Sequence, residues 1–331
     1  MRAATSTGRA NLNPRRKSIF RPVSTSLRES RVPVPQNLQP SPRLTRQDLQ
    51  TRWFPATLLA VTDKAAQLRA LHKGPDILVL PNAWDAISAR IFEAEGFPAI
   101  ATTSAGVANA LGYADGGAVP PREMIEAVAR ITRAVKVPVT ADIEHAYGAT
   151  PSAVADNVLR VIAAGAVGIN IEDILPGATE LEELTLQSDK ISTIAKAAQT
   201  SGVKIVINAR TDVFLRQIGP PEGRVAMAIQ RGKAFLAAGA DCVFVPYAMD
   251  PDIIRALVQG IGPINILATK GVPSIAELQA LGVARVSVGS GPHRATLALT
   301  RDIARQLKTQ GIYDAFTNHA LRPDEANGLV S

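Results

Sequence analysis

Short apolar runs alternate with amphipathic stretches along most of this chain. Eight runs are continuously apolar and only a few residues long, which indicates buried strands. These runs are 77–81, 99–103, 137–142, 167–172, 204–210, 241–246, 264–268 and 285–289. Elsewhere the apolar positions recur with the helical period of 3.6 residues, which predicts helices. The predicted helices are 62–72, 85–95, 122–135, 152–164, 186–200, 222–238, 252–259, 274–281 and 293–309.

The order of these elements predicts the fold class. Strands that are apolar on both faces are typical of a parallel sheet covered by helices. Eight strand–helix units between residues 61 and 331 match the size of an α/β protein of the (β/α)8 TIM-type barrel class. An open doubly wound sheet is the alternative, but no Gly-x-Gly-x-x-Gly follows the first strand. Five helices end next to a glycine, which predicts left-handed caps at Gly96, Gly165, Gly202, Gly239 and Gly282.

Positive charge is concentrated at the N-terminus. The whole chain carries +7, from 36 Lys and Arg against 29 Asp and Glu, which by itself suggests an acidic partner. Residues 1–60 hold 11 of the basic residues and two acids, so they carry +9 and residues 61–331 carry −2. The first stretch is rich in Arg, Ser and Pro and shows no periodicity. We therefore predict a flexible basic arm at 1–60 and one barrel domain at 61–331.

Three interpretations of the arm stay open. Its basic, Ser-rich, acid-poor composition is typical of an organelle transit peptide, which would place the protein in an organelle matrix. It could instead be an upstream extension that does not belong to the native protein, and the expected location is then cytoplasmic. Nucleic-acid binding by the arm has no accompanying motif, so no nucleic-acid partner is expected.

Composition excludes several classes of protein. The single cysteine, Cys242, rules out an internal disulfide and a zinc site built from cysteines. No run of 18 apolar residues occurs, so no membrane partner is expected. Aromatic residues make up 4% of the chain, which leaves few side chains for stacking on bases.

Acidic residues end two neighbouring predicted strands, where a barrel places its active site. Asp142 and Glu144 are two residues apart and share one face of an extended segment, and Glu172 ends the next strand. Three such carboxylates repel one another unless a cation or protons intervene. Oxygen ligands suit Mg2+ first and Mn2+ second, so we predict a metal site of these three residues. Asp173 is assigned instead to a helix cap or a salt bridge.

Other strand ends carry groups that suit an anionic substrate. Arg210 ends the fifth strand, where a guanidinium could clamp a carboxylate or stabilise an oxyanion. Ser104, Ala105 and Gly106 follow the second strand and offer backbone N–H groups as an anion cradle. The plain alternatives are a structural ion pair of Arg210 with Glu172 or Asp212, and a tight turn at residues 104–106.

Five stretches together resemble the isocitrate lyase/phosphoenolpyruvate mutase superfamily, most closely its shorter bacterial phosphonomutase-like members. The stretches are LPNAWDAISAR (80–90), TTSAGVANALGYADG (102–116), VPVTADIEHAYG (137–148), AGAVGINIED (164–173) and VINARTD (206–212). This resemblance implies a barrel that often exchanges its last helix between the subunits of a dimer or tetramer. It also implies Mg2+ and small 2-oxo or 2-hydroxy carboxylate substrates.

The resemblance also implies roles for single residues. Asp142 resembles the direct metal ligand, and Glu144 and Glu172 resemble ligands that act through water. Ser104 and Ala105 resemble the backbone cradle for the substrate. The remaining matches are the gating-loop acid Asp115, the substrate-clamping Arg210 and the first-loop residues Asn82, Trp84 and Asp85.

This chain departs from the family pattern in the loop after the fourth strand. The lyases carry Lys-x-Cys-Gly there and the phosphomutases Lys-x-Asn-Ser, whereas this loop reads EDILPGATELEELTLQSDK (172–190). Cys242 lies within a predicted strand and is expected to be an inert core thiol. The usual Gly-Tyr-Gly after the third strand is replaced by a segment that begins at His145, which is therefore a candidate substrate contact or proton donor.

These observations lead to three hypotheses. The first is a Mg2+-dependent lyase that cleaves a C–C bond of a small 2-oxo or 2-hydroxy acid through an enolate, without a catalytic cysteine. The second is a phosphonomutase or another enzyme that acts on a P–C bond. The third is a barrel that has lost catalysis and acts as a binding protein.

Overall fold

The computed structural model describes residues 55–318 and 320–330, with side chains described from Ala60 onward. The predicted arm at 1–60 lies almost wholly outside the described residues, so its flexibility stays a prediction. The first described helix, α2 (Pro55–Leu71), shows that the predicted helix start at Thr62 is wrong. Pro55 suits the first helical position, and the Ala and Leu residues that follow favour a helix, so the helix begins earlier.

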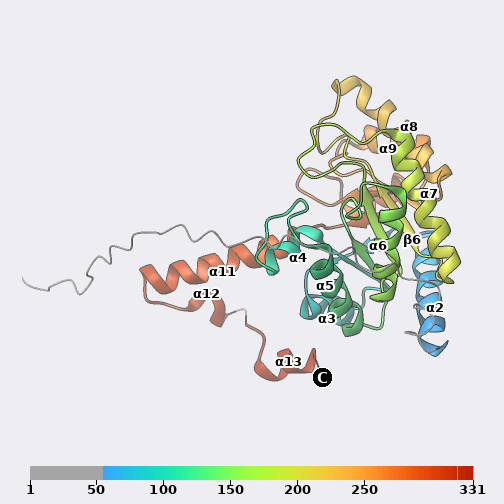
Figure 1. Ribbon diagram of the computed structural model, residues 1–331. Helices are drawn as coiled ribbons and strands as arrows, with labels where there is room; N and C mark the ends of the chain where they lie inside the picture. The colour runs from blue at the N-terminus through green and yellow to red at the C-terminus, as the bar shows by residue number, and fades with distance from the viewer. Residues whose placement is uncertain (1–54, 319, 331) are drawn as a thin grey trace, which may run out of the picture. The chain divides into compact units, whose positions relative to one another are not determined.

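Nine parallel strands form a nearly closed barrel with helices on its outside (Figure 1). The strands are β1 (Leu78–Leu80), β2 (Asn82–Ala83), β3 (Ile100–Thr102), β4 (Val139–Asp142), β5 (Gly168–Glu172), β6 (Val206–Arg210), β7 (Cys242–Phe244), β8 (Ile264–Leu267) and β9 (Arg285–Ser287). Their order is β1-β9-β8-β7-β6-β5-β4-β3-β2. This arrangement confirms the predicted TIM-type α/β barrel.

The first predicted strand is divided in two at Pro81. β1 pairs with β9, whereas β2 pairs with β3, so the chain crosses from one neighbour to the other within one extended segment. Proline has no N–H to donate to a sheet, and the strand changes partners at this residue. The carbonyl of Pro81 still accepts from the amide of Ala101, 2.9 Å away. β1 and β2 stand at the two ends of the strand order, so this one segment connects those ends and nearly closes the barrel.

Helices follow the strands as the periodicity predicts. They are α3 (Ala86–Ala94), α4 (Ser104–Ala110), α5 (Pro121–Ala134), α6 (Pro151–Ala163), α7 (Leu184–Ser201), α8 (Arg224–Ala237), α9 (Pro251–Ile261), α10 (Ile275–Ala280) and α11 (Gly291–Thr309), with a 3-10 turn at Pro221–Gly223. Two short helices follow, α12 (Asp314–Thr317) and α13 (Pro323–Gly328). All five glycines predicted to cap helices have positive φ, from 84° at Gly282 to 111° at Gly239. Helix α4 was not predicted from the sequence, where a tight turn was the alternative at its start.

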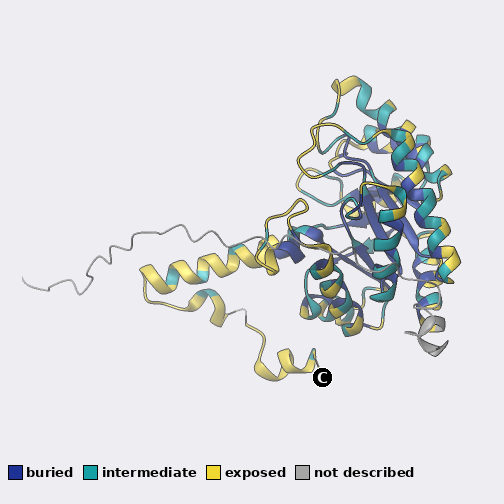
Figure 2. Ribbon diagram, viewed as in Figure 1, coloured by how far each residue is buried: buried dark blue, intermediate teal, exposed yellow. Residues whose placement is uncertain are grey.

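The core lies inside the ring of strands and between the strands and the helices (Figure 2). Strand residues such as Leu80, Ile169 and Val206 are inaccessible or nearly so. Burying one such side chain contributes about 1.5–3 kcal/mol. The core therefore fixes the strand ends, and with them the residues that follow.

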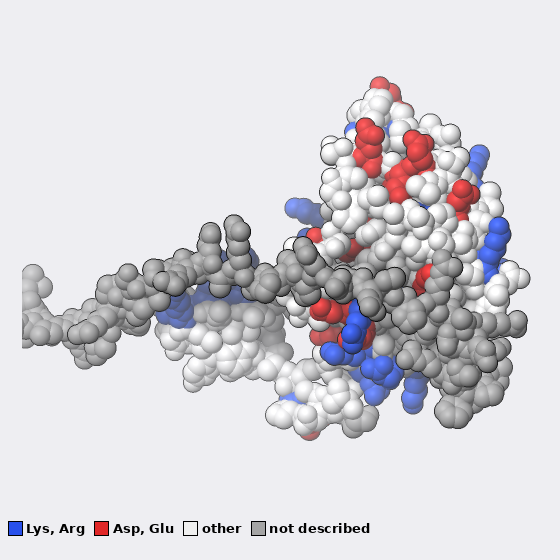
Figure 3. All heavy atoms as spheres, in the orientation of Figure 1, with Lys and Arg blue, Asp and Glu red and all other residues white. Residues whose placement is uncertain are grey.

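Side chains of both charges lie on the face of the molecule that Figure 3 shows. Among the described residues, no helix is both long enough and apolar enough to cross a membrane.

Candidate functional site

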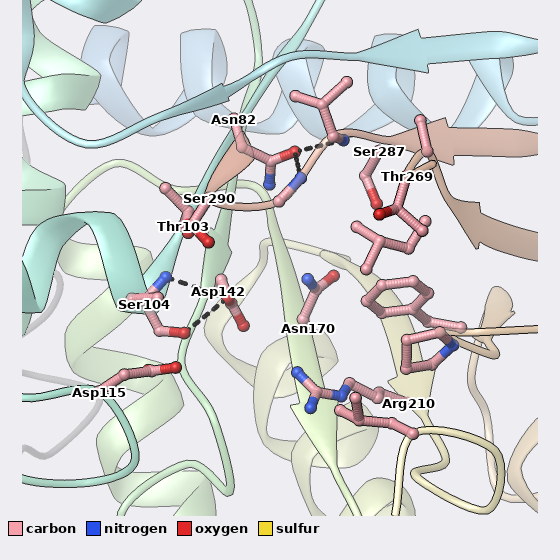
Figure 4. Close-up of a pocket in the computed structure, with 18 of the residues that line it drawn as sticks. Asn82, Thr103, Ser104, Asp115, Asp142, Asn170, Arg210, Thr269, Ser287 and Ser290 are labelled. Atoms are coloured by element: carbon pink, nitrogen blue, oxygen red, sulfur yellow. Dashed lines mark hydrogen bonds between the residues drawn. The ribbon is translucent and has the colours of Figure 1, made fainter. Parts of the chain in front are cut away.

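A pocket of about 430 Å³ opens at the carboxyl ends of the strands (Figure 4). It is lined by Asn82, Thr103, Ser104, Ala105, Asn109, Asp115, Asp142, Asn170, Arg210, Leu215, Phe244, Pro246, Tyr247, Leu267, Ala268, Thr269, Ser287, Val288, Gly289, Ser290 and Arg294. Six of the predicted site residues belong to this set: Asn82, Ser104, Ala105, Asp115, Asp142 and Arg210. Barrel enzymes use this end of the fold for catalysis.

Asp142 is held at the end of β4 by its neighbours on β3 and α4. Its Oδ2 accepts hydrogen bonds from the backbone N–H of Ser104 at 3.0 Å and from the hydroxyl of Ser104 at 2.8 Å. Its other oxygen, Oδ1, is buried and has no hydrogen-bond partner among the described residues. A buried carboxylate oxygen without a partner is costly, so Oδ1 is available to a ligand in the pocket.

Arg210, at the end of β6, is surrounded by acids. Its Nη1 lies 2.9 Å from Oε2 of Glu172, and its Nε lies 2.5 Å from Oδ1 of Asp212. Burial by itself lowers the pKa of Arg210, but these two carboxylates more than offset burial and raise the pKa above its ordinary value. Arg210 is therefore a permanent, oriented cation on the wall of the pocket.

Glu144 and Glu172, the other predicted metal ligands, do not line the pocket that Asp142 lines. Burial, and then the negative charge of Asp142, raises the pKa of Glu144 to about 7. Burial also raises the pKa of Glu172 to about 8, against the opposing effect of Arg210. Within residues 55–318 and 320–330, no three His, Cys, Asp or Glu side chains are gathered as a ready-made metal site. The reason is that Glu172 turns toward Arg210, whereas Asp142 turns toward Ser104.

Two loops meet above these carboxylates. A Cβ atom at Gly117, where φ is 86°, would lie 2.5 Å from Cγ of Pro176, so the loop after α4 packs directly on the loop after β5. Asp115 precedes this contact and lines the pocket. Burial, followed by the charge of Asp142, raises the pKa of Asp115.

Three predicted substrate-binding residues lie outside the pocket lining. Asp85 caps α3, because its carboxylate accepts from the amide of Ser88 at 2.7 Å. The ring of Trp84 packs on the ring of His293 at 5.2 Å between centroids. Gly106 is buried against Trp84, whose Cβ would lie 2.9 Å from a Cβ at this position. These three residues therefore support the loops that follow β2 and β3 and do not contact the pocket.

His145 also lies outside the pocket lining. Its ring meets the ring of Tyr147 edge-on, with centroids 5.6 Å apart. Burial, and then the charge of Lys190, lowers the pKa of His145. Lys190 forms a buried ion pair with Glu182, 2.6 Å between Nζ and Oε1, at the end of the loop after β5. His145 therefore lies beside the loop that departs from the family pattern.

Asp173 and Asn82 each have partners that give them a structural role. Asp173 forms a buried ion pair with Arg231 at 2.6 Å, which agrees with its assignment to a salt bridge. Asn82 lines the pocket, but its Oδ1 accepts from the amides of Val288 and Gly289, both at 2.9 Å, and its Nδ2 donates to the carbonyl of Thr102. Its amide thus ties β9 to the β2–β3 pair.

Sequence reasoning missed several polar residues of the pocket. They are Thr103, Asn109, Asn170, Tyr247, Thr269, Ser287, Ser290 and Arg294. A signal existed for Asn170, since it is a polar residue inside an otherwise apolar strand, two residues before Glu172 and therefore on the same face. Tyr247 has a φ of 65°, a strained conformation that no sequence pattern announces.

Comparisons with known proteins agree with this geometry. Residues 68–308 match the family model described as phosphoenolpyruvate phosphomutase. The uncharacterized protein MT2054 of Mycobacterium tuberculosis (strain CDC 1551 / Oshkosh) is 40% identical over 237 residues, 71% of this chain and 86% of that protein. A structure from Burkholderia cenocepacia J2315, provisionally described as a phosphonomutase, is 38% identical with a TM-score of 0.71, over 74% of this chain and 99% of that one.

A relative named for a defined reaction is also similar. The structure of 2,3-dimethylmalate lyase shares 27% identity and a TM-score of 0.71, over 81% of this chain and 95% of that one. The resemblance inferred from the sequence motifs is thereby confirmed. The chain belongs to the phosphoenolpyruvate phosphomutase family and is an enzyme of the isocitrate lyase/PEP mutase superfamily.

Proposed function

We propose that this enzyme is a Mg2+-dependent lyase that cleaves a C–C bond of a small 2-oxo or 2-hydroxy carboxylate through an enolate. The observation that carries the proposal is the pairing of two groups in one pocket: the unpartnered Oδ1 of Asp142 and the guanidinium of Arg210. A metal ligand beside a fixed cation suits a substrate with a carboxylate next to a carbonyl or hydroxyl oxygen.

The donor set fits Mg2+. Hard divalent ions prefer carboxylate oxygens, and both Oδ1 of Asp142 and Oε2 of Glu144 are buried without a partner among the described residues. Asp142 would hold the ion directly, and Glu144 and Glu172 would hold it through water; Mn2+ could replace it. When bound, Mg2+ supplies Lewis-acid stabilisation of the enolate charge.

The chain's own groups perform the remaining work. Arg210 binds the substrate carboxylate and is kept in place by Glu172 and Asp212. Ser104 positions Asp142, so its N–H is occupied, and Ala105 remains as the cradle residue that faces the pocket. Asp115, on the loop above the site, excludes water when the loop is closed. Retro-aldol cleavage requires a proton donor; His145 and Tyr147 are the candidates, and a substrate would have to reach beyond the pocket lining to meet either side chain.

Turnover of a panel of 2-oxo and 2-hydroxy acids with Mg2+ tests the proposal. We expect release of a C–C cleavage product from at least one member, and no turnover after chelation of the metal. Cys242 is buried and burial raises its pKa to about 12, so thiol-blocking reagents should leave the activity unchanged. Loss of activity on thiol modification, or no turnover of any member, would contradict the proposal.

A phosphonomutase is the second candidate, because the matching family model bears that name. Phosphoenolpyruvate phosphomutase of Streptomyces hygroscopicus is 29% identical over 266 residues. Phosphorus NMR with phosphonopyruvate separates the two candidates, since a mutase converts the phosphonate signal into a phosphate-ester signal. Unchanged phosphonopyruvate together with C–C cleavage in the panel supports the lyase.

Mg2+ should stabilise the folded enzyme more at pH 8 than at pH 6. The pKa values of about 7 for Glu144 and about 8 for Glu172 lie above the ordinary 4.5, so the metal-free folded state binds more protons than the unfolded chain. Without metal, stability therefore falls as pH rises from about 4.5 to 8. At pH 6 Mg2+ must displace these protons, whereas at pH 8 most are already lost.

Thermal unfolding with and without millimolar Mg2+ at both pH values measures this difference. The Asp142→Asn variant is the control and should show little gain in Tm at either pH. An equal gain in the wild-type protein at pH 6 and pH 8 would refute the assignment of the two glutamates.

We also propose that the enzyme is a homo-oligomer, a dimer or tetramer. In α11, His293 is the one residue that is buried, and Figure 2 shows the helix and the segment after it largely exposed. Exposed apolar side chains lie along α11 and the segment after it: Leu297, Leu299, Leu307, Ile312, Tyr313, Phe316 and Leu321. Apolar surface of this extent is typical of a subunit contact. Light scattering on the purified full chain measures the oligomeric state.

A further inference from the structure

A row of polar side chains crosses the barrel at the base of the pocket. Asn170 on β5 is in register with Asp142 on β4 and with Asn208 on β6. Asn170 is 5% exposed and lines the pocket together with Asp142 and Arg210. Figure 4 shows Asn170 between these two residues, with its side-chain nitrogen on the Asp142 side. Its amide therefore lies where the proposed substrate would bind.

Two residues on other strands of the barrel, Asn208 and Arg285, fix the orientation of the Asn170 amide. Its Oδ1 accepts from Nδ2 of Asn208 at 2.8 Å and from Nη2 of Arg285 at 3.3 Å. These two bonds use both lone pairs of the oxygen, and a flipped amide would set its NH2 against two donors. No acceptor among the described residues takes up Nδ2 of Asn170. This donor is left for a group in the pocket.

Arg285, behind Asn170, is a buried cation without a matching acid. The side chain is inaccessible and forms no ion pair within the described part of the chain, although the charge of Asp142 acts on it through space. Its Nε and Nη1 also lack hydrogen-bond partners there. Burial lowers its pKa to about 10, so it stays charged at neutral pH. A buried uncompensated charge is strongly unfavourable, and an anion bound next to Asn170 would offset it.

The Asn82 amide provides a contrast within the same pocket. Its oxygen and nitrogen are both engaged by backbone groups of β3 and the segment after β9, so its hydrogen bonds serve the fold. Asn170 differs because its nitrogen is uncommitted and its oxygen is polarised by a cation. Such an arrangement strengthens the donor that faces the pocket.

We propose that Asn170 binds the substrate directly, by donating a hydrogen bond from Nδ2 to an anionic oxygen of the small carboxylate. Arg285 is a positioning residue that orients the Asn170 amide and adds positive potential at the base of the pocket. Together they select substrates that place an anionic oxygen at this point, between Asp142 and the Arg210 clamp. This inference rests on the proposed function, because it assigns a contact to the same substrate.

Calorimetric titration of the full chain with oxalate in the presence of Mg2+ tests the role of Asn170. Oxalate mimics an enolate, and phosphonopyruvate hydrolase, which shares this fold at 24% identity, has been crystallised with oxalate and Mg2+. We expect Asn170→Ala to raise the Kd of oxalate about 10- to 100-fold, as for loss of a hydrogen bond to a charged group. Asn265→Ala is the matched control.

The control residue is also buried and bonds to Ser287 at 3.1 Å, but it does not itself line the pocket. Its replacement should leave the Kd of oxalate within about threefold of wild type. Wild-type affinity in Asn170→Ala, or an equal loss in both variants, would overturn the assignment. Wild-type protein that binds no oxalate would instead overturn the proposed function, so the two failures are distinguishable.

A second pair of variants separates positioning from folding. Asn170→Asp keeps an acceptor for Asn208 and Arg285, so we expect an unchanged or higher Tm together with weak oxalate binding, because a carboxylate now faces the anion. Arg285→Met should weaken oxalate binding at least about tenfold, and Arg285→Lys should recover part of the affinity by restoring the charge. Tight oxalate binding by folded Asn170→Asp, or by folded Arg285→Met, would contradict the proposal.

Discussion

Replacing Asp142 with Asn is expected to lower kcat/KM on the order of 10³-fold, with little change in Tm. The amide oxygen of Asn can still accept from the N–H and hydroxyl of Ser104, so the packing at the end of β4 is preserved. What is lost is the negative charge that would hold Mg2+ in the pocket. Steady-state assays with the substrate found in the panel, together with thermal unfolding, measure both quantities.

Asp250→Asn is the matched control for this prediction. Asp250 is exposed, lies outside the pocket and caps α9 through the amides of Asp252 and Ile253, a role that Asn also fulfils. The control should retain wild-type activity and a wild-type response of Tm to Mg2+. An Asp142→Asn enzyme that stays active and is still stabilised by Mg2+ would show that the metal lies elsewhere.

Arg210→Met is expected to damage both stability and activity. It leaves the buried carboxylate of Asp212 and the half-buried Glu172 without the cation that lies between them, and breaking a buried pair costs about 3–5 kcal/mol. Loss of the substrate clamp should also lower kcat/KM about 10²- to 10³-fold. Urea unfolding and kinetic assays measure the two effects.

Two further variants distinguish these effects. Arg216→Met is the control, because Arg216 is 54% exposed and lies 3.8 Å from Asp212, so its removal should change stability by less than about 1 kcal/mol. Adding Glu172→Gln and Asp212→Asn to Arg210→Met should recover much of the stability but none of the activity. Recovery of activity in that triple variant would show that Arg210 supports the fold and does not bind the substrate.

The fold was largely predictable from the sequence, and the reason is local. Buried parallel strands must be apolar on both faces, and glycine is the residue that ends a helix in the left-handed region at low cost. These requirements determine the residue types at positions such as Ile169, Val206 and Gly202, so the pattern can be recognised without a structure. The break at Pro81 and the early start of α2 were not predicted, because the residue types in a strand or in the first turn of a helix depend less on strand partners and on the exact helix start.

The sequence predicted which residues stand at the strand ends of the candidate site, but it did not predict most of their contacts. The residue order placed Asp142 and Arg210 at the catalytic end of a barrel, and both line the pocket. It offered an ion pair with Glu172 or Asp212 as the alternative role of Arg210, and the structure shows both pairs. It did not show that Asp85 would cap α3. Those partners are chosen by side-chain direction and packing, which a linear pattern does not contain.

By itself, then, the sequence determined the barrel, the family and the acids that end its strands, because each depends on residue type and spacing along the chain. The tertiary structure alone decided which of those groups face the substrate. It brought Asn208 and Arg285 behind Asn170 and left one amide nitrogen free toward the pocket. That choice depends on the register of strands far apart in the sequence, since one residue of slip would turn each side chain to the other face.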